Sequence, residues 1–338
     1  MENKYKSLSK SVCALLLSGL ALTSVTVVAQ QDYEYTKQTY SRGQHAEVAY
    51  EGWKENDDGT ITMLFGYFNH NWDEELDIPI GENNRFTTGD PDRGQPTHFL
   101  PRRNRFTFSV IVPGDFGDDE LAWELTSPNG VTRTAYGTLR SDYKVDNVTI
   151  MSETGALGAG TSDEATRANI PPNSQLIGDG FRTVNVGETL SFQTRVTDDG
   201  VPEPFDPMAL VRLFGGPAAA FATPEVVRTM MMKMPPPKPT VAKNNGLYLS
   251  WNVYRAPENV ENVQDHVHFD PPQVKPWEDT RPSANSPWSW LWIPPKMPED
   301  GIVDVSVTFD KPGTYLLWGR ADDGGLYTDQ YLTVTVRE

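Results

Sequence analysis

The feature that most constrains the fold of this chain is a succession of short β-type runs separated by turn residues. Residues 60–69 (TITMLFGYFN) are β-branched and aromatic, and residues 105–112 (RFTFSVIV) alternate between polar and apolar side chains. Residues 120–126 and 131–139 flank the segment 127–130 (SPNG), whose Asn-Gly pair tolerates the positive φ of hairpin turns. This half of the chain lacks sustained helical spacing of apolar residues, so the pattern predicts antiparallel strands packed as a β-sandwich.

The C-terminal half shows the same pattern around a long stretch of unusual composition. Strands are expected at residues 183–186, 189–196, 303–309, 314–320 and 327–336. Residues 202–300 hold most of the prolines and one convincing strand, at 247–254. Loops of this length are uncommon in compact domains and are usually functional or disordered. We therefore predict a Pro- and Trp-rich insertion at 202–300.

An export signal is expected at the N-terminus. Residues 1–29 combine a start with three lysines, an apolar run over 12–22 and small residues up to Ala29. The apolar run has about half of the ~20 residues that span a bilayer, so we expect no membrane insertion. Lipidation at Cys13 is disfavoured because the preceding residues are not small and apolar. We predict cleavage after Ala29 and a periplasmic or extracellular product.

Composition divides the remaining chain into four parts. Residues 30–44 are polar and unpatterned, which predicts a flexible leader, and residues 45–146 form the first predicted β-sandwich domain. Residues 147–180 are rich in small and polar residues and contain Pro-Pro, which predicts a linker. Residues 181–338 form the second predicted domain.

Charge and cysteine content limit the chemistry of the exported chain. Signal cleavage removes Cys13, the only cysteine, so the exported chain has no disulfide. The whole chain carries −17, and loss of three Lys and one Glu with the signal makes this −19, which disfavours nucleic acid and anionic membranes as partners. A basic island is expected to pair with acidic loops of the same chain. It comprises His98, Arg102, Arg103 and Arg105.

The closing segment resembles a known family. The residues Phe309-Asp-Lys-Pro-Gly-Thr-Tyr315-Leu-Leu are followed by 321–325 (ADDGG) and 331–336 (YLTVTV). These resemble the last strands of extracellular immunoglobulin-like modules of the PKD kind, over about 35 residues, and such a resemblance implies fold better than function. It implies that Tyr315 packs at a corner and bonds back to the backbone. We predict an all-β fold of two immunoglobulin-like antiparallel β-sandwich domains; the rest of the chain is similar to secreted bacterial proteins of unassigned function.

Motifs of catalysis are missing from the sequence. There is no Gly-x-Ser-x-Gly elbow, no His-Glu-x-x-His, no phosphate-binding Gly loop and no Cys nucleophile in the exported chain. Acidic residues precede a glycine at 56–59, 198–200, 299–301 and 322–324. There we expect turns in which Asp caps its own backbone, rather than calcium sites. We predict no catalytic residues, and a hydrolase with acidic catalytic residues is the third functional alternative.

Two motifs suggest a metal-handling protein as the second alternative. His266 and His268 are two apart, so on one strand both rings would project from the same face, roughly 6 to 7 Å apart at the backbone. The run 230–234 (MMMKM) supplies thioethers, which suit Cu(I). Surface histidines and a hydrophobic loop explain these motifs equally well. The predicted copper ligands are His266, His268, Met231 and Met234; calcium is the other ion considered, at the oxygen clusters 90–94 and 115–120.

The leading functional prediction rests on a row of tryptophans. If residues 286–293 are extended, three tryptophans spaced by two share one face, on which a ring-shaped ligand or a partner can stack. The other interpretation is that the rings fill the second core or the interdomain seam. We predict an exported, non-catalytic binding or scaffold protein of the bacterial cell envelope. It would contact an envelope protein or polysaccharide through Trp277, Trp288, Trp290 and Trp292.

Overall fold

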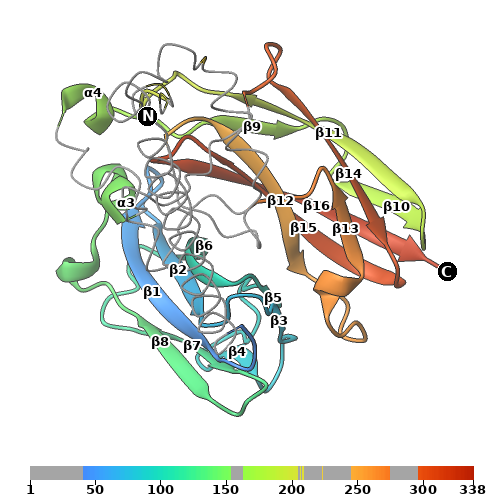
Figure 1. The fold of residues 1–338 in the computed structure, drawn as a ribbon. Helices are drawn as coiled ribbons and strands as arrows, with labels where there is room; N and C mark the ends of the chain where they lie inside the picture. The colour runs from blue at the N-terminus through green and yellow to red at the C-terminus, as the bar shows by residue number, and fades with distance from the viewer. Residues whose placement is uncertain are drawn as a thin grey trace, which may run out of the picture.

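Strands form nearly all of the regular secondary structure, in sheets that are antiparallel with one exception among the described residues (Figure 1). The computed structural model describes residues 41–153, 163–204, 245–274 and 296–338, with residues 206, 208 and 223. The predicted all-β antiparallel fold class is confirmed. The number of domains and the extent of the insertion stay predictions. Several predicted segments lie outside the described residues: the signal peptide, most of the leader, Met231, Met234, Trp277, Trp288, Trp290 and Trp292.

The first half of the described chain packs two three-stranded sheets face to face. One sheet has the order β1-β2-β6, with β1 at Ala46–Glu55, β2 at Ile61–Asn69 and β6 at Arg102–Val112. The other has the order β4-β7-β8, with β4 at Asn84–Phe86, β7 at Leu121–Thr126 and β8 at Thr132–Gly137. A two-stranded pair joins β3 (Leu76–Asp77) to β5 (His98–Phe99). The predicted hairpin of residues 120–139 is confirmed as β7–β8.

Aromatic rings from both sheets form the core of this half. Phe65 on β2 and Phe108 on β6 stack with their centroids 5.3 Å apart. Trp123 on β7 meets Phe108 edge to face at 4.9 Å. Its indole Nε1 donates a hydrogen bond to Asn84 Oδ1 at 3.0 Å, which satisfies the polar end of a buried ring. The alternation seen in the sequence therefore places these rings between the two sheets.

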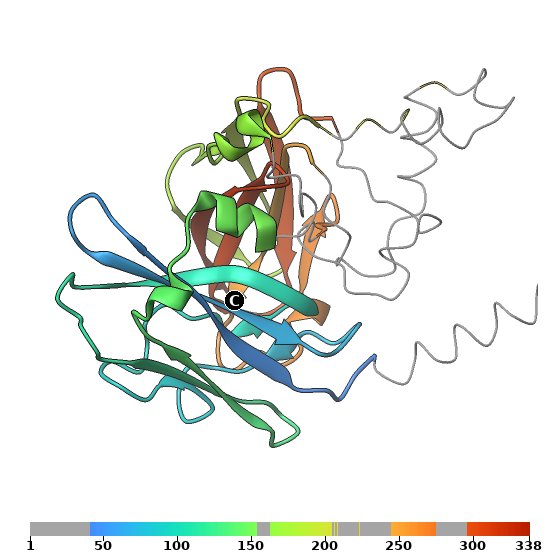
Figure 2. The ribbon, with the colours of Figure 1, turned by 90° about the vertical axis from the view of Figure 1, so that its left-hand side faces the viewer.

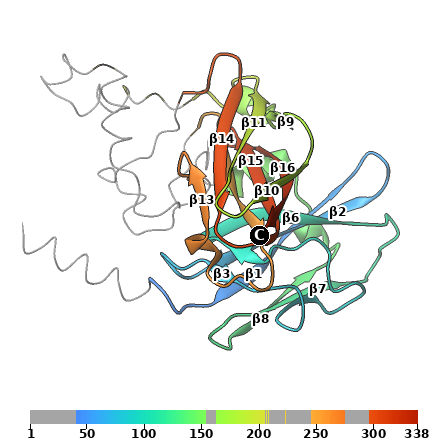
Figure 3. The ribbon, with the colours of Figure 1, turned by 90° about the vertical axis from the view of Figure 1, so that its right-hand side faces the viewer.

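The second half contains two four-stranded sheets (Figure 3). One has the order β13-β14-β11-β9 and the other the order β10-β16-β15-β12. This is the immunoglobulin arrangement, a four-stranded A-B-E-D sheet facing a C-F-G sheet, with β10 added in parallel beside β16. The strands are β9 (Asn173–Leu176), β10 (Phe181–Asn185), β11 (Thr189–Thr197), β12 (Tyr248–Arg255), β13 (Val267–Asp270), β14 (Ile302–Phe309), β15 (Gly313–Asp322) and β16 (Tyr327–Arg337).

The core of this half also has immunoglobulin features. Trp251 on β12, the third strand of the arrangement, is fully buried and packs edge to face on Phe192 of β11 at 4.9 Å. Gly319 lies opposite Trp251, and a Cβ there would be 2.6 Å from the indole ring, so a side chain would displace it. The buried Tyr315 donates its hydroxyl to the carbonyl of Lys311 at 3.0 Å, which confirms the role that the resemblance implied.

The described residues also contain four short helical elements. They are η1 (Ser141–Tyr143), α3 (Asn147–Glu153), α4 (Glu164–Arg167) and η4 (Val263–Asp265). Ile150 and Met151 of α3 pack with Phe106 of β6 and Leu326, next to β16, so this helix contacts both halves (Figure 2). The segment predicted as a linker, 147–180, therefore contains two helices and also β9, which pairs with β11.

The outer face of the β12–β15 pair is buried against the first half. Tyr254 and Trp318 belong to the same hydrophobic core as the first-half aromatics. Arg320, which is 3% exposed, donates to both carboxylate oxygens of Asp329 at 2.7 Å. It also donates to the carbonyl of Phe106 at 2.6 Å. Asp329 lies on β16, in the same half as Arg320, so this two-pronged pair orients the guanidinium, and its donation to Phe106 then joins the two halves.

Candidate functional site

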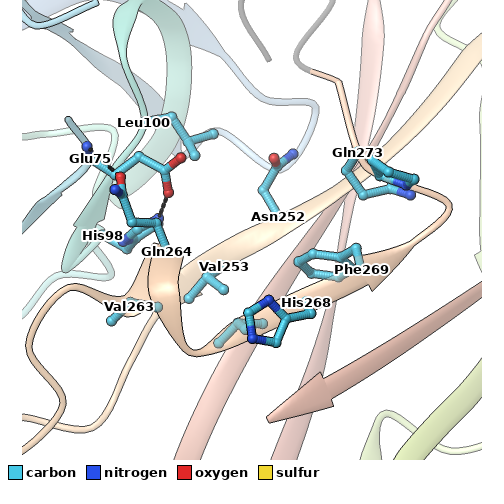
Figure 4. A pocket seen from close by; sticks show the side chains of 12 residues that line it. Glu75, His98, Leu100, Asn252, Val253, Val263, Gln264, His268, Phe269 and Gln273 are labelled. Atoms are coloured by element: carbon cyan, nitrogen blue, oxygen red, sulfur yellow. Dashed lines mark hydrogen bonds and ion pairs between the residues drawn. The ribbon is translucent and has the colours of Figure 1, made fainter. Parts of the chain in front are cut away.

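A cavity of about 280 Å³ opens where the two halves meet (Figure 4). Its lining residues come from four places in the fold. The first half supplies Glu75, His98 and Leu100; β12 supplies Asn252 and Val253; η4 supplies Val263 and Gln264; β13 and the residues after it supply Val267, His268, Phe269, Pro272 and Gln273.

His98, in the cavity wall, is hydrogen-bonded to two carboxylates. Its ring is 3% exposed, with Nδ1 2.7 Å from Asp77 Oδ1 and Nε2 2.8 Å from Glu75 Oε2. Burial alone would lower the pKa of His98, but the charges and hydrogen bonds of Asp77 and Glu75 outweigh it and raise the pKa to about 10. The ring is therefore an imidazolium at neutral pH and donates both N–H groups.

Asp77 and Glu75 also connect the first half to η4. Asp77 Oδ2 accepts a hydrogen bond from the backbone N–H of Val263 at 2.9 Å. The backbone N–H of Glu75 donates to the side-chain oxygen of Gln264 at 3.1 Å. A protonated His98 with both nitrogens engaged is not a general base, so this trio joins the halves rather than transferring protons.

Asn252 is the polar group that the fold leaves unused at this site. Its side chain is 6% exposed, and among the described residues its Nδ2 has no hydrogen-bond partner. Figure 4 shows it between the Glu75–His98 pair and the Phe269–Gln273 wall. An unmade hydrogen bond at a buried donor costs about 1 to 3 kcal/mol. A ligand acceptor in the cavity would satisfy this donor.

The lining residues support binding better than covalent chemistry. They include carboxamides, a carboxylate, a half-buried phenyl ring and aliphatic side chains. Among the described lining residues there is no Ser, Thr, Cys, Lys or Tyr, and the carboxylate of Glu75 is already paired with His98. What the cavity offers is an apolar wall with a few convergent polar groups, as small-molecule sites do.

The structure describes two of the four predicted copper ligands. His268 lies on β13, is exposed, and places Nε2 3.1 Å from Asp310 Oδ2. His266 ends η4 with φ −125° and ψ −5°, before β13 begins. The expectation that one strand carries both rings is therefore wrong, because His266 belongs to the turn that ends η4 and only His268 lies on the strand. Copper binding by these residues stays a prediction.

Pairing of the basic island within the chain is confirmed, but Arg103 and Arg105 pair with a carboxylate on strand β1 rather than with an acidic loop. Arg103 lies 2.6 Å from Glu51 Oε1, and Arg105 is 3.8 Å from the other oxygen of the same buried carboxylate. Arg102 instead stacks on the ring of Trp72 at 3.9 Å and donates to a backbone carbonyl. None of the three arginines is among the residues that line the junction cavity.

The acidic-glycine motifs form turns, as predicted. In each motif an Asp side chain accepts a hydrogen bond from the backbone N–H of the residue two positions later. These acceptors are Asp58, Asp198, Asp300 and Asp322. Burial, and then the charge of Asp322, raise the pKa of the adjacent Asp323 to about 7. In the oxygen cluster 90–94, both oxygens of Asp92 pair with Arg255, at 2.7 and 2.9 Å. Each motif thus has a structural use.

Strand order and core together define the second half as an immunoglobulin-like β-sandwich. No protein-family model matches the chain, and no curated protein matches its sequence. The described helices include none long and apolar enough to cross a membrane.

The chain is similar to several solved structures at low level. The N-terminal eight Ig domains of the Down syndrome cell adhesion molecule are 9% identical over 87% of this chain and 27% of that chain, with a TM-score of 0.21. Domains 4 and 5 of the S-layer protein SbsC are 9% identical over 87% and 98%, with a TM-score of 0.21. The Yersinia pseudotuberculosis adhesin InvE is 9% identical over 86% and 58%, with a TM-score of 0.22. Likenesses of this size carry no argument, so the fold assignment rests on the topology.

Proposed function

We propose that this protein is an exported, non-catalytic binding protein of the bacterial cell envelope that holds one ring of a neutral polysaccharide in the junction cavity. The observation that carries the proposal is the buried, unpartnered amide of Asn252 in that cavity. Buried polar groups in native folds are usually hydrogen-bonded, so an unpaired donor in a cavity wall calls for an explanation, and a bound ligand supplies one.

Size and charge favour this class of ligand. A cavity of about 280 Å³ is just below the ~300 to 1,000 Å³ of drug-sized sites, so it suits one small ring. Two negative side chains, Glu75 and Asp77, surround the one positive charge of His98, and the chain as a whole is strongly acidic, which disfavours anionic ligands. Phe269 offers an apolar ring and Asn252 a donor, which together suit the apolar face and hydroxyl oxygens of a sugar.

The predicted tryptophan row extends this proposal. Trp277 follows Gln273, which lines the cavity, by four residues in the sequence. We assign Trp277, Trp288, Trp290 and Trp292 to contacts with further sugar rings of the same polysaccharide, because flat aromatic faces stack on rings.

An oligosaccharide array followed by calorimetry with the best neutral hit tests the proposal. Asn252→Leu removes the unpartnered donor at nearly constant volume. We expect it to weaken binding about tenfold and to stabilise the fold by about 1 kcal/mol, because an unmet buried polar group disappears. Ser250→Ala is the matched control: Ser250 is two residues earlier on β12 and is fully buried, its Oγ is also unpartnered among the described residues, and it does not line the cavity.

The control should keep full affinity. The proposal fails if no neutral saccharide binds, if only charged saccharides or an envelope protein bind, or if Asn252→Leu binds as tightly as the wild type.

A further inference from the structure

Two histidines face each other just beyond the end of the β1–β2 ladder. Ala46 pairs with Asn69 at this end, and the backbone N–H of His70 donates to the carbonyl of His45 at 3.0 Å. Opposed residues of an antiparallel pair project side chains to the same face. The two imidazole rings accordingly stack, with centroids 4.6 Å apart and planes at 28°.

A carboxylate completes the group. Glu47 is two residues after His45 and so lies on the same face of β1. Its Oε2 is 3.2 Å from His70 Nε2, and one ligand atom from each of the three side chains lies within 4.8 Å of the others. Ligand atoms on a four-coordinate zinc ion, with bonds of about 2.0 to 2.2 Å, are about 3.4 Å apart. Small rotations of these partly exposed side chains bring all three to one ion.

We propose that His45, Glu47 and His70 bind a divalent transition metal, Zn²⁺ in the first instance, with three protein ligands and one open position. Two imidazoles and one carboxylate are a donor set that zinc uses when its fourth position holds water or another ligand. The site lies in the first half and is independent of both the junction cavity and the predicted copper ligands.

The neighbours of the group suit this role. Arg133 Nε donates to Glu47 Oε1 at 3.0 Å, which orients the carboxylate and leaves Oε2 toward the histidines. Phe68 packs edge-on against the His70 ring at 4.4 Å. Outer partners of this kind hold metal ligands in position. An ion pair of Glu47 with His70 and Arg133 accounts for those three side chains but gives the His45 ring no role.

Calorimetric titration of ZnCl₂ into the metal-free mature chain tests the site. We expect one zinc ion per chain, and a loss of affinity of at least ~100-fold in His45→Ala and in Glu47→Gln, which each remove one of three ligands. Arg133→Ala should weaken binding about 10-fold, as loss of an orienting partner does. Glu55→Gln is the matched control, because Glu55 is another carboxylate of β1 that pairs with a cation, Lys144, but belongs to no group of metal-ligating side chains among the described residues.

Co²⁺ substitution gives a second measurement that does not depend on zinc affinity. Visible bands of a four-coordinate Co²⁺ should form with the wild type and with Glu55→Gln, and disappear with His45→Ala. Circular dichroism checks that each variant is folded, and His45→Gln replaces His45→Ala if the latter does not fold. Absence of stoichiometric zinc from the wild type, or equal zinc affinity of wild type and His45→Ala, overturns the proposal.

Discussion

Replacement of His98 by glutamine removes the charge that joins two carboxylates at the junction. In the folded protein the pKa of His98 is raised from 6.5 to about 10. A raised pKa stabilises the fold fully below the unfolded value of 6.5, and this contribution disappears as the pH rises through 10. From these two values the contribution is about 3 kcal/mol at pH 7.5 and about 1 kcal/mol at pH 9.5, as an upper limit.

Urea unfolding of wild type and His98→Gln across this range is the assay. Between pH 7.5 and pH 9.5 the wild type should lose about 2.5 kcal/mol more than the variant. At pH 7.5 the variant should be about 3 to 5 kcal/mol less stable, because Glu75 and Asp77 keep buried charges without a cation. Over the same range the variant should lose only the smaller contribution of its buried tyrosines, whose pKa values are raised above 10 by burial. The pKa of Asp323, at about 7, lies below this window and does not distort the comparison.

His268→Gln is the control, since that exposed ring is paired with Asp310 at the surface and its loss should cost under about 1 kcal/mol. Equal pH dependence of wild type and His98→Gln would refute the reasoning, because the raised pKa would then not belong to His98.

Three further predictions follow from the same structure. Arg320→Ala should cost about 3 to 5 kcal/mol in urea unfolding, because Asp329 is left unpaired, and Arg320→Lys should cost at least about 1 kcal/mol because it loses the two-pronged geometry. Edman sequencing of the exported protein should begin at Gln30, and its thermal midpoint should be the same with and without reductant; a lipid-modified Cys13 would contradict this. The last prediction concerns alanine variants of Trp288, Trp290 and Trp292. In thermal or urea unfolding, at least two of the three should each lose under ~1.5 kcal/mol of stability, whereas loss of the fold in all three would mean that the rings are core.

The strands that could be predicted are those whose side chains alternate. Residues 105–112 and 189–196 have one apolar face each and appear as parts of β6 and β11. β9 and β13 were missed because four residues each, NSQL and VHFD, carry too little pattern. Their pairing partners in β11 and β14 determine them, and those contacts are distant in sequence.

The junction cavity was not predicted, for a related reason. Ser250 and Asn252 alternate with Leu249, Trp251 and Val253, a pattern that indicates a strand with one solvent-facing side. In the structure both polar residues are buried, because the first half covers that face. The sequence signal for the cavity is this polar pair in the middle of an apolar strand. Its burial follows from the contact between the two halves, which the sequence does not show.

The parallel pairing of β10 with β16 has a mechanical consequence. Phe181 is opposite Thr333 and Asn185 is opposite Arg337, so the first residue of one strand and the last of the other lie at opposite ends of the ladder. Tension between these two points pulls along the strands, and the ladder bonds must then break together rather than one after another. A protein tethered at its C-terminal strand and loaded through its preceding chain therefore meets the force in shear, the direction in which a short sheet resists rupture best.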